Sequence, residues 1–416
     1  MSNKRVVITG LAAISPLAND FRSSWEKLLA GESGVAPITA FDAGDFDAQI
    51  AGEVKDFDPE AFGIPVKQSK RMDRFVQLSV AAGMELMKDS GYVIDEANAH
   101  DVAVCIGVGM GGLNTIEVFH SKLVESGPGR VSPFYIPMLI SNMAPGQISI
   151  FTGAKGPNLA ACSACASALH AIGYAYSDIM LGRCTAAITG GAESTISPMG
   201  ISGFTALKAL CTLNDDPQKA SRPFDKNRSG FVMGEGAGLL FLEELESARK
   251  RGARIYAEIT GFGASGDAYH MTAPQEDGLG MAASMQRALR DAGLDPKDVG
   301  HINAHGTSTH LNDLCETKAI KRVFGQHAYN VPIVSNKSQV GHLLGGAGGI
   351  ESVFSVLTLH QGIIPGTINY ETPDPECDLN YMVHGPEKKQ VDIVLCNDFG
   401  FGGTNGSIIY KRWSGK

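Results

Sequence analysis

The sequence has no apolar run long enough to cross a bilayer, no framework of paired cysteines and no excess of positive charge. Each absence excludes a class of protein. No stretch approaches the roughly 18–20 apolar residues of a transmembrane helix. Eight cysteines among 416 residues do not make a disulfide scaffold, and a net charge of −9 disfavours sequence-independent binding to nucleic acid. We therefore expect reduced thiols and a cytoplasmic location, with an organelle matrix as the alternative, and no membrane or nucleic-acid partner.

Long polar stretches are missing as well, which excludes an extended disordered chain. Charged residues make up 19% of the sequence and hydrophobic residues 44%, so there is enough apolar material for a large core. A chain of 416 residues is too long for one ordinary core, and two domain-sized units are expected. The 50 glycines exceed the usual share of roughly 7%, and their clustering indicates tight turns and close backbone approaches.

Five segments of the first part of the chain have counterparts in the second part, in the same order. Each series begins with a β-rich segment ending at Thr-Gly and continues through an amphipathic helix, a strand, a strand–turn–helix and a glycine-rich closing strand. The pairs are 6–15 with 256–265, 75–91 with 281–294, 101–112 with 299–309, 158–173 with 331–349, and 186–194 with 392–407. Five matches in one order indicate duplication, and alternating strands and helices predict βαβ units in an α/β fold.

The boundary between the two halves is predicted at 252/253, within the polar stretch ARKRGAR. The N-terminal half is then 1–252 and the C-terminal half 253–416. Residues 110–157 have no counterpart and are interpreted as an insertion. The prolines and glycines of SGPGRVSPFYIP predict that this insertion forms an ordered but irregular surface.

One cysteine lies where a strand is predicted to turn into a helix. PNLAACS has the character of a strand and ACASALHAIGYAYSDIM that of a helix, which places Cys165 at or just inside the helix N-terminus. Backbone N–H groups and the helix dipole would stabilise a thiolate there and could hold a developing oxyanion, as in a nucleophile elbow. The alternative is an inert buried thiol, an interpretation that suits Cys162 better. No second Cys or His cluster supports a metal site for this C-x-x-C pair.

Two histidines and a lysine lie in glycine-rich turns of the second half. His305 follows a strand in NAHGTST, while Lys337 and His342 lie in SNKSQVGHLLGGAGG. If the halves are related by pseudo-symmetry, the two strand–turn–helix segments face each other and bring Cys165 near Lys337 and His342. A lone histidine is more often a core or turn residue, but this combination favours a catalytic site.

These motifs carry a family resemblance. SACASALHAIG around Cys165, NAHGTST, KSQVGHLLGGAGG and the closing NDFGFGGTNGS resemble the β-ketoacyl-acyl carrier protein synthases, and most closely the synthase II type of fatty acid synthesis. The resemblance extends from about Arg5 to Tyr410. It implies a thiolase-like α/β fold of five αβαβα layers, built from two duplicated halves with mixed sheets, in a homodimer.

The resemblance also implies the reaction, a decarboxylative Claisen condensation. An acyl group is transferred from the phosphopantetheine arm of acyl carrier protein to Cys165. Malonyl-acyl carrier protein then loses its carboxylate, and the resulting enolate attacks the acylated cysteine. His305 and His342 would donate hydrogen bonds to the thioester oxygen, and Lys337 would orient the site. The backbone N–H groups of Cys165 and Phe399 would form the oxyanion hole. No cofactor and no metal are expected.

Further residues match family positions that support the site. Glu351 is the expected partner of Lys337, with Glu316 as the alternative. The residues expected to contact the substrate or its pantetheine arm are Thr307, Thr309, Phe399, Phe401 and Met110. The two phenylalanines would act as a movable gate. Turn capping by the threonines and core packing by the methionine are the alternatives.

Carrier proteins of this pathway are acidic, so an acidic enzyme needs a local basic patch to bind them. Spacings of three and four residues in VKQSKRMDRF predict one basic helical face, although such a run is more often only a solvated face. The residues assigned to carrier docking are Lys67, Lys70, Arg71, Arg74, Arg130 and Lys208.

Four positions depart from the family pattern. They are Ala168 for the usual Gly, Val340 for Thr, Asp398 for Ser and His310 for Pro. None belongs to the Cys–His–His–Lys set, so condensing chemistry is expected to survive, while substrate identity and gate behaviour stay open. A ketosynthase of a type II polyketide or polyene pathway is the close alternative.

Three other classes share single features with the sequence. GVGMGG, with Gly107, Gly109 and Gly112, fits the fingerprint of an NAD(P)-dependent oxidoreductase, but the acidic residue about 20 positions on is missing. Cys165 and His305 have the order of a papain-like protease, without its local signature. A non-catalytic partner that only sets chain length usually lacks the nucleophile, which is present here.

Overall fold

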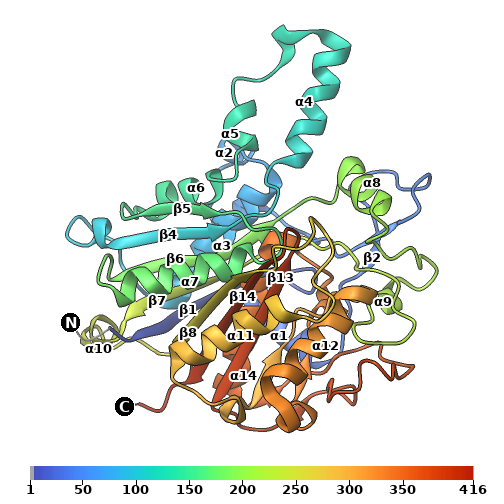
Figure 1. Ribbon diagram of the computed structural model, residues 1–416. Helices are drawn as coiled ribbons and strands as arrows, with labels where there is room; N and C mark the ends of the chain where they lie inside the picture. The colour runs from blue at the N-terminus through green and yellow to red at the C-terminus, as the bar shows by residue number, and fades with distance from the viewer. Residues whose placement is uncertain (1–3, 416) are drawn as a thin grey trace.

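The computed structural model describes residues 4–415, and their two halves share one ten-stranded sheet (Figure 1). The first half contributes strands in the order β5-β4-β6-β7-β1, and the second half continues with β8-β14-β13-β9-β10. The strands are β1 (Val6–Ile14), β4 (Val102–Gly107), β5 (Asn158–Ala161), β6 (Ala186–Glu193), β7 (Gly236–Glu244), β8 (Ala257–Gly266), β9 (His301–Asn303), β10 (Ile333–Val334), β13 (Ile393–Gly400) and β14 (Thr404–Arg412). Two small sheets pair β2 (Ala36–Pro37) with β3 (Ile50–Ala51) and β11 (Ile363–Ile364) with β12 (Glu387–Lys388).

The two halves have the same strand pairing. In the first half, β1 runs antiparallel to β7 and β7 antiparallel to β6, whereas β6, β4 and β5 are parallel. In the second half, β8, β14 and β13 repeat the antiparallel part, and β13, β9 and β10 repeat the parallel part. This equivalence confirms the prediction of an α/β fold built from two duplicated halves with mixed sheets.

The repeated Thr-Gly pair marks the same irregularity in each half. In β1 the register against β7 shifts between Ile8 and Gly10, so Thr9 is the extra residue of a bulge. In β8 the register against β14 shifts at Thr260. A bulge bends its strand, and the two bent strands pair with each other over only three residues each. Beyond these three residue pairs, the two halves of the sheet therefore diverge.

Two buried helices, α7 (Ser167–Met180) and α14 (Ala347–Gln361), lie between the halves of the sheet and contact strands of both. On the outer faces, α3 (Arg74–Ser90) and α6 (Met143–Thr152) cover the first half, while α11 (Leu279–Ala292) covers the second and α12 (His310–Phe324) packs on α11 (Figure 1). The order is helix, sheet, helix, sheet, helix, which is the five-layered arrangement expected.

Strand glycines allow the central helices to approach the sheet closely. A Cβ on Gly107 of β4 would lie 2.3 Å from the backbone nitrogen of Ala168, and one on Gly238 of β7 would lie 2.2 Å from that of Ile350. A side chain at either glycine would push a helix away from its sheet. The segments that precede α7 and α14 are thereby held near each other.

The glycine helix caps occur where the sequence predicted them. Gly91 follows α3 with φ +60°, and Gly293 follows α11 with φ +65°. The remaining helices are α1 (Phe21–Leu29), α2 (Val66–Ser69), α4 (Leu113–Ser126), α5 (Tyr135–Leu139), α8 (Pro198–Ala206), α9 (Pro217–Ala220), α10 (Leu245–Lys250) and α13 (Lys337–Val340). No helix within residues 4–415 is long and apolar enough to cross a membrane. Between α10 and β8 the chain passes from one half to the other, and the boundary at 252/253 stays a prediction.

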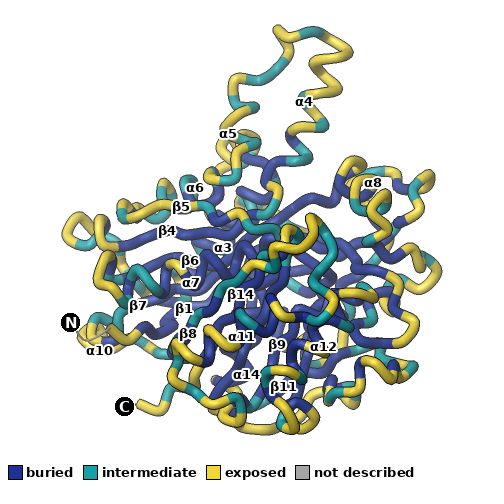
Figure 2. Tube along the Cα trace, in the orientation of Figure 1, coloured by how far each residue is buried: buried dark blue, intermediate teal, exposed yellow. Residues whose placement is uncertain are grey.

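The expected irregular surface is present only at 127–134, within SGPGRVSPFYIP, and most of the insertion is helical. It consists of α4, α5 and α6, and the first two project from the body as a hairpin (Figure 1) that is exposed along most of its length (Figure 2). The exposed apolar residues of α4 include Ile116, Val118, Leu123 and Val124. Leu113, Ile116 and Leu123 recur at three- and seven-residue spacing, a helical signal that the expectation drawn from the prolines and glycines overlooked.

Candidate active site

A pocket of about 470 Å³ opens beside Cys165, and both halves of the molecule line it. The predicted site residues on its wall are Met110, Cys165, His305, Thr307, Thr309, His342, Phe399 and Phe401. An apolar hollow with a few convergent polar groups is typical of a site for a small molecule or a substrate arm. Lys337, Glu351 and Glu316 lie buried behind this wall.

Cys165 lies in a tight turn between β5 and α7. Ala164 has φ +51°, a left-handed conformation that costs a residue with a Cβ roughly 1–2 kcal/mol. Ser167 Oγ accepts a hydrogen bond from Ser163 N–H at 2.9 Å and donates to Ala164 O at 2.6 Å, which holds the turn. Because Ala166 is the cap of α7, Cys165 lies just before the helix and not at or inside its N-terminus.

Two imidazoles from the second half face the sulfur. His342 follows α13, and its Nε2 lies 3.0 Å from Cys165 Sγ. His305 follows β9, and the sulfur and one ring nitrogen of each histidine all lie within 4.8 Å of one another. The two rings meet edge to face with their centroids 5.2 Å apart. Residues that are far apart in sequence and come from opposite halves therefore form one buried cluster.

Burial determines the resting protonation state of this cluster. It raises the pKa of the Cys165 thiol to about 12; the Asp398 charge acts in the same direction and the Lys337 charge opposes it. Burial also lowers the pKa of both His305 and His342 well below 6.5, and the Lys337 charge adds to that effect. The direction for the sulfur is opposite to the acidic thiol that the sequence predicted. The resting cluster is a thiol beside two neutral imidazoles, so His342 Nε2 is the nearest acceptor for the thiol proton.

Lys337 is a fully buried lysine held by two carboxylates. Its Nζ donates to Glu351 Oε1 and lies 3.4 Å from Asp398 Oδ1. Burial by itself would lower the pKa of Lys337, but Glu351 and Asp398 raise it above its ordinary value. The side chain is therefore an ammonium group that can only donate.

Glu316, the alternative partner of Lys337, has a different position. Its carboxylate accepts hydrogen bonds from the backbone N–H of His305 at 2.9 Å and of Gly306 at 2.8 Å. Burial raises the pKa of this carboxyl to about 8, against the effect of the two N–H donors. Glu316 thus holds the turn that carries His305, and the direct contact with the ammonium belongs to Glu351.

Asp398 belongs to the site, although the sequence suggested only a changed gate. Its Oδ1 lies 2.6 Å from His305 Nδ1, and the same nitrogen lies 3.3 Å from Lys337 Nζ. A carboxylate oxygen and an imidazole nitrogen this close share a proton. Burial raises the pKa of Asp398 to about 6, so near neutral pH the carboxylate is mostly ionised and the proton is on Nδ1. The sequence contained one sign of this role: Asp398 departs from the pattern of the family that the sequence resembles, which usually has serine there.

The backbone donor beside the sulfur also differs from the one expected. Phe399 is the seventh residue of strand β13, and its ring packs against His305 with the centroids 5.8 Å apart. The N–H that donates to Cys165 Sγ is that of Phe401, after the strand. Gly400 allows this approach, because a Cβ there would lie 3.0 Å from the backbone nitrogen of Cys165. The backbone N–H that the structure places at the sulfur is therefore that of Phe401, two residues after the expected Phe399.

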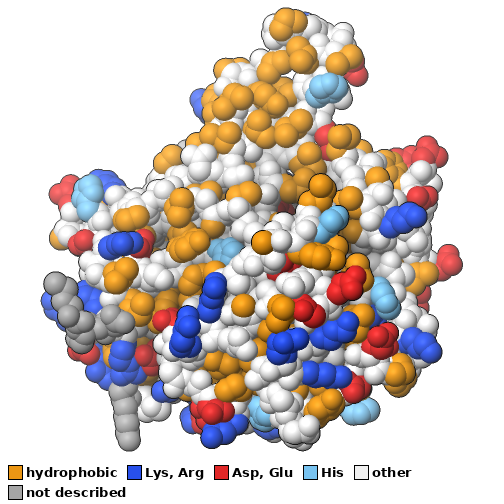
Figure 3. All heavy atoms as spheres, in the orientation of Figure 1, with side chains coloured by type: hydrophobic (Ala, Val, Ile, Leu, Met, Phe, Trp, Pro, Cys, Tyr) orange, Lys and Arg blue, Asp and Glu red, His pale blue; other side chains and the backbone are white. Residues whose placement is uncertain are grey.

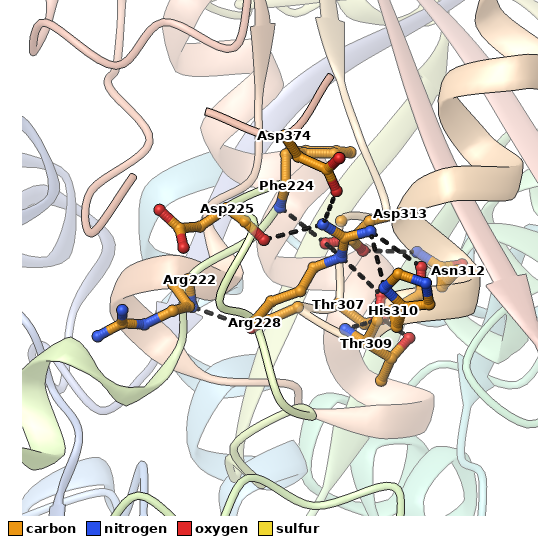
Figure 4. A network of polar contacts seen from close by, with 12 residues as sticks. Arg222, Phe224, Asp225, Arg228, Thr307, Thr309, His310, Asn312, Asp313 and Asp374 are labelled. Carbon is orange, nitrogen blue, oxygen red and sulfur yellow. Dashed lines mark hydrogen bonds and ion pairs between the residues drawn. The ribbon is translucent and has the colours of Figure 1, made fainter. Parts of the chain in front are cut away.

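The threonines of NAHGTST lie in a rigid loop on the pocket wall. The hydroxyl oxygens of Thr307 and Thr309 are 2.9 Å apart. Arg228 fixes this loop: its guanidinium donates to Thr309 O at 3.3 Å and to His310 O at 3.1 Å (Figure 4). The same guanidinium donates to Asp374 Oδ2 at 2.6 Å. The hydroxyls are thus presented to the pocket from a fixed backbone, and their contact with a pantetheine arm stays a prediction.

The glycine fingerprint GVGMGG binds a carboxylate of the chain itself. Glu193, at the end of β6, accepts hydrogen bonds from Gly109 N–H at 2.7 Å and from Gly111 N–H at 3.1 Å. It also accepts from Met110 N–H at 3.1 Å and from Gly345 N–H of the other half at 3.3 Å. A dinucleotide would need these same N–H groups for its phosphates, so the loop is not arranged for a nucleotide.

The predicted basic helical face does not form. α2 ends at Ser69, and Arg74 turns inward to make a forked contact with Glu235 at 2.7–3.0 Å. Three of the cluster, Lys67, Lys70 and Arg71, are exposed.

The other basic residues lie on different elements. Arg71 stacks on Phe134 of the insertion, with its guanidinium carbon 4.3 Å from the ring centroid. Arg130 is exposed in the hairpin, and Lys208 is exposed beside the pocket. The exposed positive charges therefore lie in three places: around α2, in the hairpin, and beside the pocket.

The other thiols are unpaired, as the sequence predicted, since none of the eight cysteines forms a disulfide. Cys162 is exposed, and its Sγ donates to Gly109 O at 3.3 Å, so its interpretation as a buried residue was wrong. Ala168 and Val340, two departures from the family pattern, are buried in the core, whereas His310 is exposed and lines the pocket.

The chain is similar to known proteins over nearly its whole length. The family model described as "Beta-ketoacyl synthase, N-terminal domain" matches residues 3–248, and "Beta-ketoacyl synthase, C-terminal domain" matches residues 256–371. Proteins named 3-oxoacyl-[acyl-carrier-protein] synthase 2 from Vibrio harveyi and from Staphylococcus aureus (strain COL) are 50% and 49% identical to it over 413 and 411 residues, which are 99% of this chain and of each relative.

Solved structures show the same similarity at lower identity. A β-ketoacyl synthase from Burkholderia phymatum STM815 superposes with a TM-score of 0.92 at 36% identity, covering 99% of this chain and all of that one. A chain of the ishigamide ketosynthase/chain length factor gives 0.92 at 33% identity, with the same coverage.

Proposed function

Because this chain belongs to the β-ketoacyl synthase family, we propose that Cys165 carries an acyl group that the protein condenses with malonyl-acyl carrier protein. The protein is an acyltransferase of fatty acid chain elongation, and its product is a 3-oxoacyl-acyl carrier protein. The assignment of these catalytic residues rests on one observation: a sulfur and two imidazoles form a buried cluster, with His342 Nε2 at 3.0 Å from Cys165 Sγ.

Acylation of Cys165 needs an acceptor for the thiol proton. His342 Nε2 takes this proton as the sulfur attacks the thioester carbon of the acyl-carrier substrate. The negative oxygen that forms is stabilised by the backbone N–H groups of Cys165 and Phe401, next to the sulfur. His342 then returns the proton to the departing pantetheine sulfur, and the ring is neutral again.

Decarboxylation of the malonyl group produces an enolate whose oxygen needs N–H donors. His342 can donate from Nε2 once its single proton has moved to that nitrogen from Nδ1, a change that breaks no hydrogen bond because no described residue bonds to Nδ1. His305 can donate from Nε2 only as an imidazolium, because its Nδ1–H is committed to Asp398. The malonyl carboxylate brings a negative charge into the buried pocket, which favours this second proton on His305.

The condensation step consumes that proton. The enolate carbon bonds to the carbonyl carbon of the Cys165 thioester, and the carbon–sulfur bond breaks. Carbon dioxide leaves without a proton, so the departing thiolate must gain one to return to the resting thiol. His305, stabilised as an imidazolium by Asp398, supplies it and becomes neutral. The cycle needs no cofactor, because both substrates arrive as activated thioesters.

A reconstituted condensation tests the proposed function. Incubation with an acyl-acyl carrier protein and malonyl-acyl carrier protein is expected to give a 3-oxoacyl product two carbons longer and one carbon dioxide per product. Mass spectrometry of the carrier protein measures the product, and a panel of acyl chains determines the length preference. Carbon dioxide release without chain growth for every member of the panel would contradict the proposal.

A ketosynthase of a polyketide pathway is the second candidate, favoured by the similarity to a ketosynthase/chain length factor structure. Relatives named 3-oxoacyl-[acyl-carrier-protein] synthase 2 are more similar in sequence, which supports the fatty acid assignment. The same reconstitution separates the two, because a polyketide enzyme extends its own 3-oxo product whereas an elongating enzyme releases it.

We also propose that acyl carrier protein docks on the exposed basic residues beside the pocket and the insertion. Lys70 and Arg71 are exposed and belong to no described ion pair, unlike Arg74. An acidic partner gains most from charges that are not already neutralised within the protein. The docking role of Lys67, Lys70, Arg71, Arg130 and Lys208 rests on this complementarity.

Reversal of Lys70 and Arg71 to glutamate is expected to raise the KM for carrier-bound substrate by about tenfold or more, since like charges then face each other. The kcat/KM for a small thioester analogue should stay within about twofold. Reversal of Lys250 and Lys297, which are exposed and do not line the pocket, makes the same change in net charge and serves as the control. Equal losses on both substrates would contradict this docking surface.

We further propose that the protein is a homodimer that covers the projecting hairpin. Figure 3 shows apolar side chains gathered on this projection. Its exposed apolar residues are Ile116, Val118, Leu123, Val124, Ile136 and Ile140. Nearby, β5 is an edge strand with Leu159 half exposed, and an apolar surface of this kind marks an interface. Sedimentation equilibrium should give twice the mass of one chain; a mass of one chain would contradict the dimer.

The cytoplasmic location stays a prediction.

A further inference from the structure

The sulfur and imidazoles of the pocket also form a set of zinc ligands. Zn²⁺ binds thiolate sulfur at about 2.3 Å and imidazole nitrogen at about 2.0–2.1 Å in tetrahedral geometry, which separates neighbouring ligand atoms by about 3.3–3.8 Å. Cys165, His305 and His342 offer one sulfur and two nitrogens within 4.8 Å of one another. The distance of 3.0 Å between Cys165 Sγ and His342 Nε2 needs only a small side-chain movement to reach that spacing.

Asp398 provides the support that a zinc-binding histidine requires. A metal-bound imidazole almost always donates its other N–H to a carboxylate, carbonyl or water, which fixes the tautomer and the ring orientation. Asp398 Oδ1 lies 2.6 Å from His305 Nδ1, so the proton on that nitrogen leaves the Nε2 lone pair for the pocket.

The surroundings suit a dication with one open position. The fourth ligand position faces the pocket, where a water molecule can enter. The nearest fixed positive charge, the Lys337 ammonium, is in contact with both Glu351 and Asp398. The positive charge of this ammonium is thereby compensated before it reaches the three ligands, so it does little to repel a dication.

We propose that Cys165, His305 and His342 form a latent Zn²⁺ site, with Asp398 behind His305, and that occupation by Zn²⁺ reversibly blocks the enzyme. Binding breaks the S–H bond of Cys165, forms a Zn–S bond and releases the proton to solvent. The ion engages the sulfur that must attack the acyl thioester, and it occupies the space where the thioester oxygen would meet the two rings. Free zinc thereby becomes an inhibitor that competes with acyl loading.

Titration of the metal-free full-length protein with Zn²⁺, followed by calorimetry, tests the site without any substrate. We expect one ion per chain in the pocket, and Co²⁺ as a probe should show the visible absorption of a tetrahedral cobalt–thiolate complex. Acyl loading of Cys165 in the unaltered protein should remove both signals, as should Cys165→Ala. Asp398→Ser should weaken Zn²⁺ affinity by about 10–100-fold, the usual effect of losing a carboxylate that supports a ligand. Asp398→Asn, which keeps an acceptor for Nδ1–H without the charge, should weaken it less.

Cys162→Ala is the matched control and should bind Zn²⁺ as the unaltered protein does. Unchanged binding after acyl loading or in Cys165→Ala would place the ion elsewhere and overturn the proposal, as would the absence of binding. Equal affinity in Asp398→Ser and the unaltered protein would overturn the role of the carboxylate. A protein that binds Zn²⁺ in the pocket but does not condense substrates would contradict the proposed function alone, so the two failures are distinguishable.

Discussion

Replacement of Cys165 by alanine is expected to lower kcat for condensation by about 10⁴-fold or more, the scale seen when a covalent nucleophile is removed. Without the sulfur no acyl-enzyme can form, and the enolate has no electrophile to attack. His305 and His342 remain, so carbon dioxide release from malonyl-acyl carrier protein should continue at a rate within about tenfold of the original. The mass of the protein after exposure to acyl-carrier substrate, and carbon dioxide release measured separately, check the two halves of this expectation.

The matched control for this change is Cys162→Ala, the neighbouring thiol of the C-x-x-C pair. Cys162 is exposed, whereas Cys165 is buried beside the two rings. The control should retain acyl loading and chain growth. An acyl adduct that persists on the Cys165→Ala protein and disappears from Cys162→Ala would contradict this prediction, because it would identify Cys162 as the nucleophile.

Replacement of Lys337 by methionine is expected to reduce the free energy of unfolding by about 3–5 kcal/mol, because it leaves two buried carboxylates without their counter-charge. Glu351 and Asp398 would then bind protons in the folded protein at a higher pH than before. A carboxyl whose pKa is raised by folding contributes stability that is lost as pH rises. The deficit should therefore be larger at about pH 8 than at about pH 6. Urea unfolding at fixed protein concentration measures both quantities.

An exposed ion pair provides the comparison. Lys88 contacts Glu85 at 2.6 Å on the surface of α3, and Lys88→Met should cost no more than about 0.5 kcal/mol. In the double variant Lys337→Met, Asp398→Ser, one of the uncompensated carboxylates is removed, so part of the loss should be recovered. A Lys337→Met protein as stable as the Lys88→Met protein, with no dependence on pH, would contradict a charge-balanced buried site.

The duplication could be predicted because it produces local sequence patterns that recur in both halves. The Thr-Gly pairs of the two halves lie at the same bulge, and the glycines after α3 and α11 cap their helices in the left-handed conformation. Periodicity, caps and turns involve residues only a few positions apart. Such short-range signals survive in a sequence without any knowledge of the fold.

The errors share a different cause. Arg74 was assigned to a docking surface because its spacing suits a helix, but its partner Glu235 is 161 residues away. Asp398 was interpreted as a changed gate, yet it contacts His305 across 93 residues. In both cases the nearest neighbour in space, and not the neighbour in sequence, determines what the charged group does.

The sequence by itself determined which atoms take part: one thiol at a strand-to-helix turn, two imidazoles and an ammonium in the opposite half, with the glycines that let the backbones meet. Local geometry and side-chain chemistry are enough for that. Only the tertiary structure decided their charge states, since burial raises the pKa of Cys165 and lowers that of both histidines. It also decided that His305 Nδ1 meets a carboxylate and that Phe401 supplies the backbone donor at the sulfur. These properties depend on the loss of water and on contacts between distant segments, which arise only when the two halves close around the pocket.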